Sequence, residues 1–363
     1  MYVGHLQDSY TRVDHMPEQV AGIEQSELPI FCQDWWINIA RGSSKYAELK
    51  VVHRGVVVGR LPLVLLRNRL GLLRGQDPHW SHLGGPLVDP RLSRTEQAKV
   101  IRSLLEQLPR WASFNFVCNP DLSYADLVRS AFKQSGFVHA TQMTYLRLPS
   151  EGNVLNTRKS KHKGHIKRAA KELDCVDVSA KEFVQFYEAN LKAGKKRSYS
   201  PFDTMTFLIE EAVSRGQARA IAARPHSRSQ SVDLGRSSPY DAAIVYIWDN
   251  DRCYYWLSTH RIASANNSNA KPHPDATKLL AVRAMEDAQA MNLIFDADGV
   301  ATPGADNFYR NIFGLSKEQR RDVFQRETML ERFYLRLRQQ FKSSDAFNNP
   351  SVLRPCQSFH ESL

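Results

Sequence analysis

Cysteines are few in this sequence, and none are closely paired. The five are spread over the whole chain without a Cys-x-x-Cys among them: Cys32, Cys118, Cys175, Cys253 and Cys356. An odd number at such distances argues against a disulfide framework and against a zinc site, and it favours a reducing compartment. We therefore expect a cytoplasmic protein that binds no metal.

Long apolar runs are also absent. The longest apolar stretch, Gly55–Leu66, is interrupted by Arg60 and Pro62 and is too short to cross a bilayer. Because Asp8 and Arg12 precede any apolar run, we expect neither a transmembrane helix nor a secretory signal. The remaining composition, 42% hydrophobic and 10% aromatic over 363 residues, indicates a globular chain with enough material for two domains.

Acidic residues are missing from one strongly basic stretch. Residues 157–171 hold seven Lys or Arg, two His and no acid. Without those seven, 42 basic residues face 38 acidic ones, so most of the net charge of +11 is local. A local positive charge indicates an anionic partner at this place. A narrow apolar stripe on the same stretch predicts a helix, and its members are Ile166, Ala169, Ala170 and Leu173.

Three interpretations of the basic stretch are open: a solvated linker helix, a nucleic-acid contact, and a clamp for a small ligand or headgroup that carries phosphate. No recognition-helix pairing, RNP aromatics or zinc knuckle accompanies it. We therefore do not expect DNA as a partner.

The spacing of apolar residues predicts two halves that share one order of elements: a strand pair, a helix, a strand, a short helix and a closing strand. The expected elements of the first half are strands over 47–66 with a turn at Arg54-Gly55, a helix from Ser93, a strand over 113–118, a short helix ending at Gly136 and a strand over 137–148. Ser93 and Glu96 have the spacing of a capping box, which marks the start of the helix.

The second half has two additional helices before its strands. Its expected elements are helices over 179–194 and 204–216, strands over 217–224 and 241–260, a helix over 275–292, a strand over 293–299, a helix ending at Gly314 and a strand over 321–327. We predict an N-terminal domain over residues 1–150, a C-terminal domain over 151–340 and a polar tail over 341–363. A polar insertion over 225–239 is expected to be a loop.

Two short segments of the second half carry candidate chemistry. Free backbone amides at the helix start after Pro274 could hold a pyrophosphate, although the loop contains no glycine and its spacing favours an ordinary capped helix. Asp296 and Asp298 follow an apolar strand and precede Gly299. A carboxylate at the end of a buried strand often borders a cleft and can accept a proton from an amine. The same Asp-x-Asp-Gly pattern is also common turn chemistry.

Taken in order, these segments resemble the FemABX-like branch of the GNAT superfamily, whose members carry two tandem GNAT-like domains. The resemblance spans about Leu28 to Leu337 and rests on the patterns "LPIFCQDWW", "GRLPLVLL…HLGGPLVD", "GFVHATQMTYLRL", "RKSKHKGHIKRAAKE" and "FDADG…FYRNIFG". It implies an α+β fold: two tandem GNAT-like domains of mixed, mostly antiparallel sheets flanked by helices, with a cleft between them.

The resemblance also implies a reaction, because this family transfers acyl or aminoacyl groups to amines. Members that use aminoacyl-tRNA often carry an inserted helical arm, and this sequence has none, so acyl-CoA is the favoured co-substrate. The expected acceptor is a nucleotide-linked amino sugar used for surface polysaccharide. Two alternatives stay open: an aminoacyl-tRNA-dependent peptidyltransferase, and a non-catalytic module that binds nucleotide or membrane.

Site residues follow from the resemblance as well. It implies catalytic residues at Asp298, Tyr309 and Arg310, where Arg310 stands in place of the family's usual lysine. The residues implied for the donor's pyrophosphate are Asp275, Ala276, Thr277 and Lys278. The residues implied for the acceptor are Arg158, Lys161 and Arg197 for its phosphates, with His79 and Trp80 as further contacts.

Overall fold

The computed structural model describes the chain in ten segments. These are Val20 and residues 22–42, 44–67, 71–155, 160–196, 201–226, 238–262, 271–300, 303–315 and 317–333. The predicted tail, most of the predicted insertion, Arg158 and Arg197 lie outside them. Lys161 is placed within a helix, but its side chain is not described.

The described chain forms two compact units, each with its own hydrophobic core. Unit 1 contains the residues up to Gln142 and those from Arg320 onward, and unit 2 contains residues 143–319. The boundary between the two units falls inside two strands, β6 (Val138–Arg147) and β12 (Lys317–Arg326), rather than in a linker. Each of these long strands therefore contributes residues to both units. The predicted domain boundary at residue 150 lies a few residues after β6.

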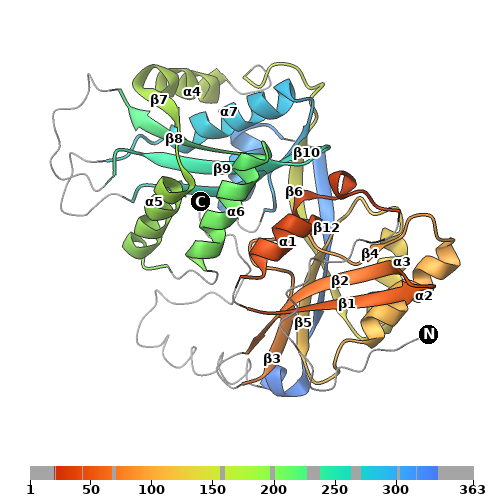
Figure 1. Cartoon of the computed structure of the whole chain (residues 1–363). Helices are drawn as coiled ribbons and strands as arrows, with labels where there is room; N and C mark the ends of the chain where they lie inside the picture. Colours follow the sequence, from red (N-terminus) through yellow and green to blue (C-terminus); the bar gives the residue numbers. More distant parts are fainter. Residues whose placement is uncertain are drawn as a thin grey trace. The chain divides into compact units, whose positions relative to one another are not determined.

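Unit 1 begins with short helical elements and continues as a sheet covered by two helices (Figure 1). The first elements are η1 (Gln25–Glu27), η2 (Ile30–Cys32) and α1 (Asp34–Ala40). The sheet has the order β1 (Lys45–His53), β2 (Val56–Arg67), β3 (Leu73–Gln76), β5 (Ser113–Cys118) and β12, with β4 (Leu87–Val88) paired to β2. The pair β3–β5 is parallel, and the other pairs of this unit with a recorded register are antiparallel.

Local chemistry explains the elements of unit 1. Arg54 and Gly55 both have positive φ, +51° and +79°, which the tight turn between β1 and β2 requires. The Ser93 capping box is present at the start of α2 (Arg94–Glu106). Helices α2 and α3 (Ala125–Gln134) bury their apolar sides in one cluster with the sheet.

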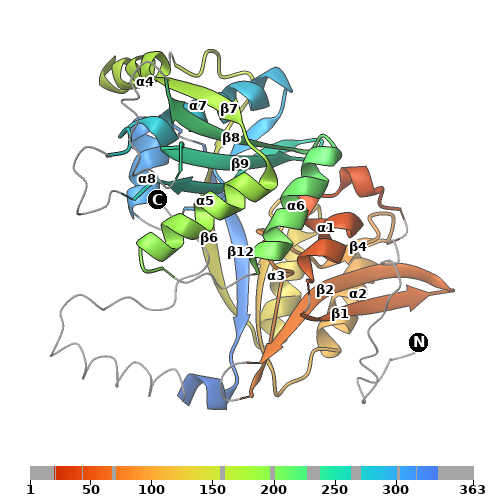
Figure 2. The same cartoon turned by 60° about the vertical axis from the view of Figure 1, so that its left-hand side comes forward.

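The strands of unit 2 have helices on both faces (Figure 2). Its order is the end of β6, then β11 (Ile294–Asp296), β10 (Arg252–His260), β9 (Ala242–Trp248), β8 (Ala218–Pro225) and β7 (Leu173–Asp177). Only the β10–β11 pair is parallel among these described strands. Both units thus have the mixed, mostly antiparallel sheets of the predicted α+β class.

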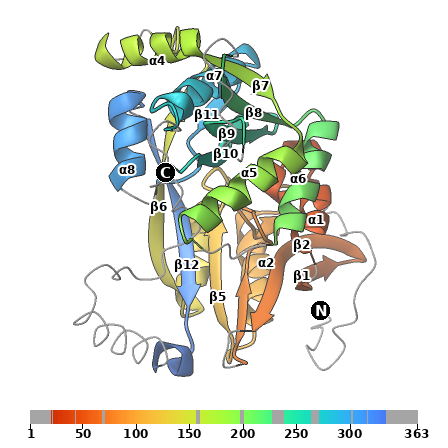
Figure 3. The same cartoon turned by 90° about the vertical axis from the view of Figure 1, so that its left-hand side faces the viewer.

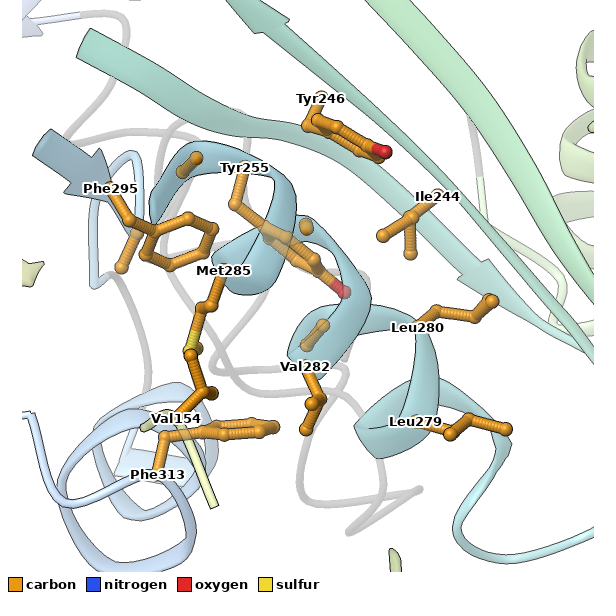
Figure 4. Packing of buried hydrophobic residues seen from close by; sticks show 14 of the residues in the cluster. Val154, Ile244, Tyr246, Tyr255, Leu279, Leu280, Val282, Met285, Phe295 and Phe313 are labelled. Atoms are coloured by element: carbon orange, nitrogen blue, oxygen red, sulfur yellow. The ribbon is translucent and has the colours of Figure 1, made fainter. Parts of the chain in front are cut away.

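The helices of unit 2 divide between the two faces. The helices are α4 (Ser160–Glu172), α5 (Ala180–Ala193), α6 (Phe202–Ser214), α7 (Ala276–Ala290) and α8 (Pro303–Asp306). Helix α7 contacts β8, β9 and β10 and shares a core with alternate residues of those strands, among them Ile244, Tyr246 and Tyr255 (Figure 4). Helices α5 and α6 cover the other face, where Asn190 donates to the Thr259 hydroxyl at 3.0 Å.

Most predicted elements are present, and the exceptions have local reasons. The elements α1, β3, β4 and β7 were not predicted; β7 spans only five residues directly after a helix, and among them only Leu173 is buried. Helix α6 begins two residues earlier than predicted, at Phe202. Ala170 is exposed, so the apolar stripe of α4 is narrower than predicted and consists of Ile166, Ala169 and Leu173. Residues 307–312 form a π-helical turn rather than an α-helix.

Candidate active site

The central feature of unit 2 is a separation of two parallel strands. β10 and β11 pair from Arg252↔Ile294 to Tyr254↔Asp296. Beyond that point β10 continues along β9 after an irregularity between Tyr254 and Leu257. The chain after β11 instead follows β6, since Ala297 N–H donates to the Tyr145 carbonyl at 2.9 Å and Val300 N–H to the Met143 carbonyl at 2.8 Å. The two neighbouring segments therefore separate: β10 after Tyr254, and the segment that follows β11 after Asp296.

Asp296 lies at the start of this divergence and is fully buried. Its Oδ1 accepts a hydrogen bond from Thr144 Oγ1 at 2.5 Å and another from Asp298 N–H at 2.8 Å. Its Oδ2 accepts from Arg252 Nη1 at 3.0 Å, and the same nitrogen donates to Gln319 Oε1 at 2.8 Å. Since both oxygens are engaged by protein groups, Asp296 fixes the turn rather than serving as the base.

Asp298 differs from Asp296 in backbone and position. It is 1% exposed and has a φ of +58°, a left-handed conformation that is uncommon outside glycine. Gly299 follows with a φ of +99°, and its N–H donates to Thr144 Oγ1 at 3.2 Å. The Asp296 network thus holds an unusual turn that presents Asp298. Backbone outliers of this kind concentrate at functional sites.

Tyr309 lies close to this turn. It belongs to the π-helical turn Asn307–Ile312, is 2% exposed, and its ring centroid is 6.1 Å from that of Tyr255 on β10. Burial raises the pKa of the Tyr309 hydroxyl well above its usual value, and the nearby Tyr255, Asp298 and Asp296 raise it further. The hydroxyl is therefore protonated at neutral pH and can donate a hydrogen bond. π-helical turns often mark functional sites.

Arg310 is held by neighbours on the same turn and strand. Its Nε and Nη2 donate to the Tyr145 hydroxyl at 2.8 and 2.5 Å, and Nη2 donates to Glu318 Oε1 at 3.0 Å. The Tyr145 hydroxyl in turn donates to Asp306 Oδ1 at 2.5 Å. Figure 3 shows α8, which contains Asp306, beside the end of β6, which contains Tyr145. Arg310 is thus half-exposed but paired, and it clamps the π-helical turn to β6.

The predicted pyrophosphate residues lie at the start of α7, but their side chains bind each other. Asp275 is 2% exposed, and its Oδ1 accepts from Lys278 Nζ. Burial acts to raise the pKa of Asp275, yet Lys278, His165 and His273 lower it overall. The Asp275 and Ala276 amides donate to His273 Nδ1 and to its carbonyl. A ligand anion at this helix start would therefore meet the amides of Thr277 and Lys278.

The basic helix α4 lies against that helix start. Its residues Ile166 and Ala169 are buried in the core that also contains α7. Beside these two residues, His165 Nδ1 and Arg168 Nη2 are each 3.7 Å from an Asp275 carboxylate oxygen. Helix α4 is therefore a packed element of unit 2, which corrects the interpretation as a solvated linker. Its described basic side chains surround the start of α7 with positive charge.

His79 and Trp80 lie in unit 1. His79 is 4% exposed, its Nε2 is 2.7 Å from Ser44 Oγ, and burial lowers the pKa of its imidazole. Trp80 is 6% exposed with a φ of +63°, another rare conformation for a large residue. The two therefore form a constrained, mostly buried segment, and their contact with substrate remains a prediction.

Asp77, two residues before His79, is expected to make the stability of the protein pH-dependent. Burial raises its pKa to about 7; Oδ2 accepts from Val117 N–H at 2.8 Å, and Oδ1 has no hydrogen-bond partner among the described residues. Because this pKa exceeds the unfolded value, the folded state binds more protons between about pH 4 and pH 7. The free energy of unfolding should therefore fall as pH rises through that window, by up to ~4 kcal/mol.

The test is urea unfolding of wild type and Asp77→Asn at pH 5 and pH 8. The variant should be the more stable protein at pH 8, and the difference should shrink or vanish at pH 5. Asp121→Asn, at an exposed position, is the control. A variant that is less stable than wild type at pH 8 would show that the Asp77 carboxylate is favourable.

Sequence reasoning did not find Thr144, Tyr145 and Arg252, which organise the site from neighbouring strands. Their sequence signal is weak, because each lies inside an ordinary strand pattern. A polar residue predicted at a buried strand position, as Arg252 is in "DRCYYWL", is the signal that could have pointed to them.

We compared the chain with known proteins, and the matches are with solved structures. No family model matches the sequence, and no curated protein matches it. Among solved structures, the chain is similar to the crystal structure of FemX, with a TM-score of 0.54 and 12% identity over 81% of this chain and 91% of FemX. A tandem GNAT protein from the clavulanic acid biosynthesis pathway also matches, with a TM-score of 0.43 and 12% identity over 79% of this chain and 84% of that protein.

The likeness to FemX confirms the expected fold class, an α+β fold of tandem GNAT-like units with mixed, mostly antiparallel sheets flanked by helices. At 12% identity it concerns the fold, and the activity has to be argued from the residues of the site. Within the described chain, no helix has both the length and the apolar character needed to span a membrane.

Proposed function

We propose that the protein is an acyl-CoA-dependent N-acyltransferase whose acceptor is an amino sugar on a nucleotide carrier. The observation that carries this proposal is the divergence of β10 from the chain after β11, with Asp298 and Tyr309 close to it. An extended thioester arm could hydrogen-bond to strand backbone at such a divergence. Its reactive carbon would then lie between a carboxylate and a phenol.

The two side chains match the proton transfers that acyl transfer from a thioester needs. The attacking amine must be neutral and must lose a proton as the new C–N bond forms, and the Asp298 carboxylate, or a water held by it, accepts that proton. The breaking C–S bond leaves a thiolate, which takes the proton of the Tyr309 hydroxyl. Return of the first proton to Tyr309 restores the site, with an amide and a thiol as products.

Arg310 has a supporting place in this proposal. The resemblance implied that Arg310 is a catalytic residue, but its guanidinium already donates to Tyr145 and Glu318. We infer that Arg310 fixes the π-helical turn and thereby the position of Tyr309. Backbone amides near the divergence are the better candidates for binding the oxyanion, because fixed donors stabilise developing charge most effectively.

The basic residues of α4, beside the start of α7, could bind the phosphate groups of both substrates. The donor's pyrophosphate would bind the first-turn amides of α7, close to His165 and Arg168. The acceptor's diphosphate is assigned to Arg158, Lys161 and Arg197, as charge-assisted contacts. This assignment is a prediction from the sequence.

A thiol-release assay tests the proposed function. Purified protein is incubated with acyl-CoAs of different chain length and a panel of nucleotide-linked amino sugars, and free CoA thiol is measured. Release that depends on both substrates, with an N-acylated sugar identified by mass spectrometry, would support the proposal. Transfer from charged tRNA alone, or the absence of acyl-CoA binding in calorimetry, would contradict it.

Replacing Lys161 by alanine tests the phosphate clamp. Loss of one charge-assisted contact to phosphate should raise the acceptor KM by roughly 10- to 100-fold, with kcat and the acyl-CoA KM little changed, because such a contact contributes about 1.5–3 kcal/mol. Lys181→Ala, at an exposed position of α5, is the matched control. An acceptor KM that is unchanged in Lys161→Ala would remove Lys161 from the clamp.

A further inference from the structure

One end of unit 1 carries exposed apolar side chains that the proposed reaction does not use. Their exposed fractions lie between 58% and 86%, and they are Trp111, Val138, Met329, Leu330 and Phe333. We call these five residues the apolar end. Single exposed apolar residues are normal on protein surfaces, but several large ones at one place indicate an interaction site.

Contacts among their neighbours bring the five together. Arg326 Nη2 donates to the Pro109 carbonyl at 2.9 Å, and its guanidinium lies 5.1 Å from the ring centroid of Phe114 and 4.9 Å from that of Phe137. Thr328 N–H donates to Ser113 Oγ at 3.1 Å. The loop with Trp111, the start of β6 with Val138 and the helical turn with Met329 therefore meet at one place.

The five side chains of the apolar end lie on loops and turns that project from the end of the sheet, rather than in a groove. The loop before β5, the turn before β6 and the helical turn after β12 all lie where Arg326 pairs with Phe114, at one end of the sheet. In Figures 1 and 2 this helical turn, in dark blue, lies beside the ends of β3 and β5. Side chains on such tips can enter an apolar medium together without opening the core.

The charge around the apolar end is mainly positive. Arg74, Arg110 and Arg332 are exposed, and Arg326 is half-buried. In the segments that form this end, 71–76, 107–113, 135–138 and 326–333, Glu327 and Glu331 are the acids, and Glu331 is only 6% exposed. Apolar tips with a tryptophan among basic residues suit the boundary between acyl chains and anionic headgroups.

We propose that the apolar end docks the protein on an anionic lipid surface, with Trp111, Met329 and Phe333 inserted at the headgroup boundary. Basic residues near the surface each strengthen binding to anionic lipid by roughly fivefold, and apolar insertion adds to this. This docking is separate from the proposed acyl transfer, which uses residues of unit 2.

Sedimentation with vesicles tests the proposal on the full-length protein. Wild type should bind vesicles that contain phosphatidylglycerol, should bind vesicles of phosphatidylcholine alone far more weakly, and should be released by salt. Met329→Ser/Phe333→Ser should lower the partition coefficient by roughly tenfold or more, because two large apolar groups lose their burial. Arg110→Glu/Arg332→Glu should weaken binding only to the anionic vesicles.

Matched variants in other places provide the controls. Phe207→Ser/Val213→Ser removes two exposed apolar groups from α6, and Lys99→Glu/Lys181→Glu makes the same charge change on α2 and α5. Both should bind like wild type, and all four variants should keep the wild-type melting temperature. Trp111→Ser supplies a second test if the double variants at the apolar end unfold.

Three results would overturn the proposal. One is the absence of wild-type binding to anionic vesicles, as expected if residues 334–363 of this chain cover the apolar end themselves. Another is equal loss of binding in the control variants, which would mean a diffuse charge effect. The third is unchanged binding in both variants at the apolar end, which would assign docking to another surface such as α4.

Discussion

Replacing Asp298 by asparagine is expected to slow acyl transfer by roughly 10²–10³, the usual effect of removing one proton acceptor or one charge-stabilising group from an active site. The amide has nearly the shape of the carboxylate but cannot take the proton of the amine. Asparagine also accepts the left-handed backbone that Asp298 adopts, with its φ of +58°, so the turn should survive. The loss should appear in kcat, with the acyl-CoA KM little changed.

Single-turnover measurements of amide formation separate this effect from changes in product release. Asp251→Asn, an exposed acid in the hairpin before β10, is the control for loss of a negative charge. Alanine is a poorer choice than asparagine at position 298, since it does not favour positive φ and would mix strain with lost chemistry. A near-wild-type rate in Asp298→Asn would remove Asp298 from the mechanism.

The sequence predicted the order of elements well because local signals mark them. The capping box at Ser93 and the two-residue turn at Arg54-Gly55 are present as expected. Each of these features depends on residues within four positions of one another. Such signals survive in a single sequence without knowledge of the tertiary structure.

The site was predictable only in part because its geometry depends on distant partners. Asp298 and Tyr309 were identified from the sequence, but the network that presents Asp298 joins Thr144 to Asp296, 152 positions apart. Likewise, the resemblance implied a catalytic role for Arg310, whereas the fold brings Tyr145 to its guanidinium from 165 positions away. No periodicity or spacing rule encodes such pairs.

The charge at the start of α7 was also predictable only in part. The sequence suggested that residues 275–278 bind an anion, and a helix start does offer free amides. The fold adds a buried carboxylate, Asp275, which already neutralises Lys278 at that place. Positive charge near this helix start then comes from basic residues of α4 such as Arg168, which approaches Asp275 only in the folded protein.

Replacing Arg252 by methionine is expected to give the largest loss of stability. Arg252 is 7% exposed and donates to Asp296, which is fully buried, at 3.0 Å. Methionine fills similar space but removes the cation that Arg252 places against the Asp296 carboxylate and the hydrogen bond that it donates to Gln319. Breaking one side of a buried ion pair costs ~3–5 kcal/mol, because the remaining charge is buried and unpaired.

Asp296→Asn in the same protein should recover part of that loss. An asparagine at 296 is uncharged, yet its carbonyl oxygen can still accept from Thr144 Oγ1 and from the Asp298 amide. The double variant should therefore be more stable than Arg252→Met alone, so the two changes should not be additive in a thermodynamic cycle. Thermal and urea unfolding of the four proteins measure this coupling directly.

An exposed ion pair provides the control that shows whether burial is the reason for the loss of stability in Arg252→Met. Arg215 pairs with Glu211 one helical turn earlier at 2.7 Å on the surface of α6, and such i,i+4 pairs contribute ~0.3–0.5 kcal/mol. Arg215→Met should thus be close to wild type in stability. If Arg252→Met were equally mild, water would have to reach Asp296, and the carboxylate would then be too well solvated to organise the turn that carries Asp298. Stability at position 252 and turnover at position 298 consequently test one structural claim from two sides.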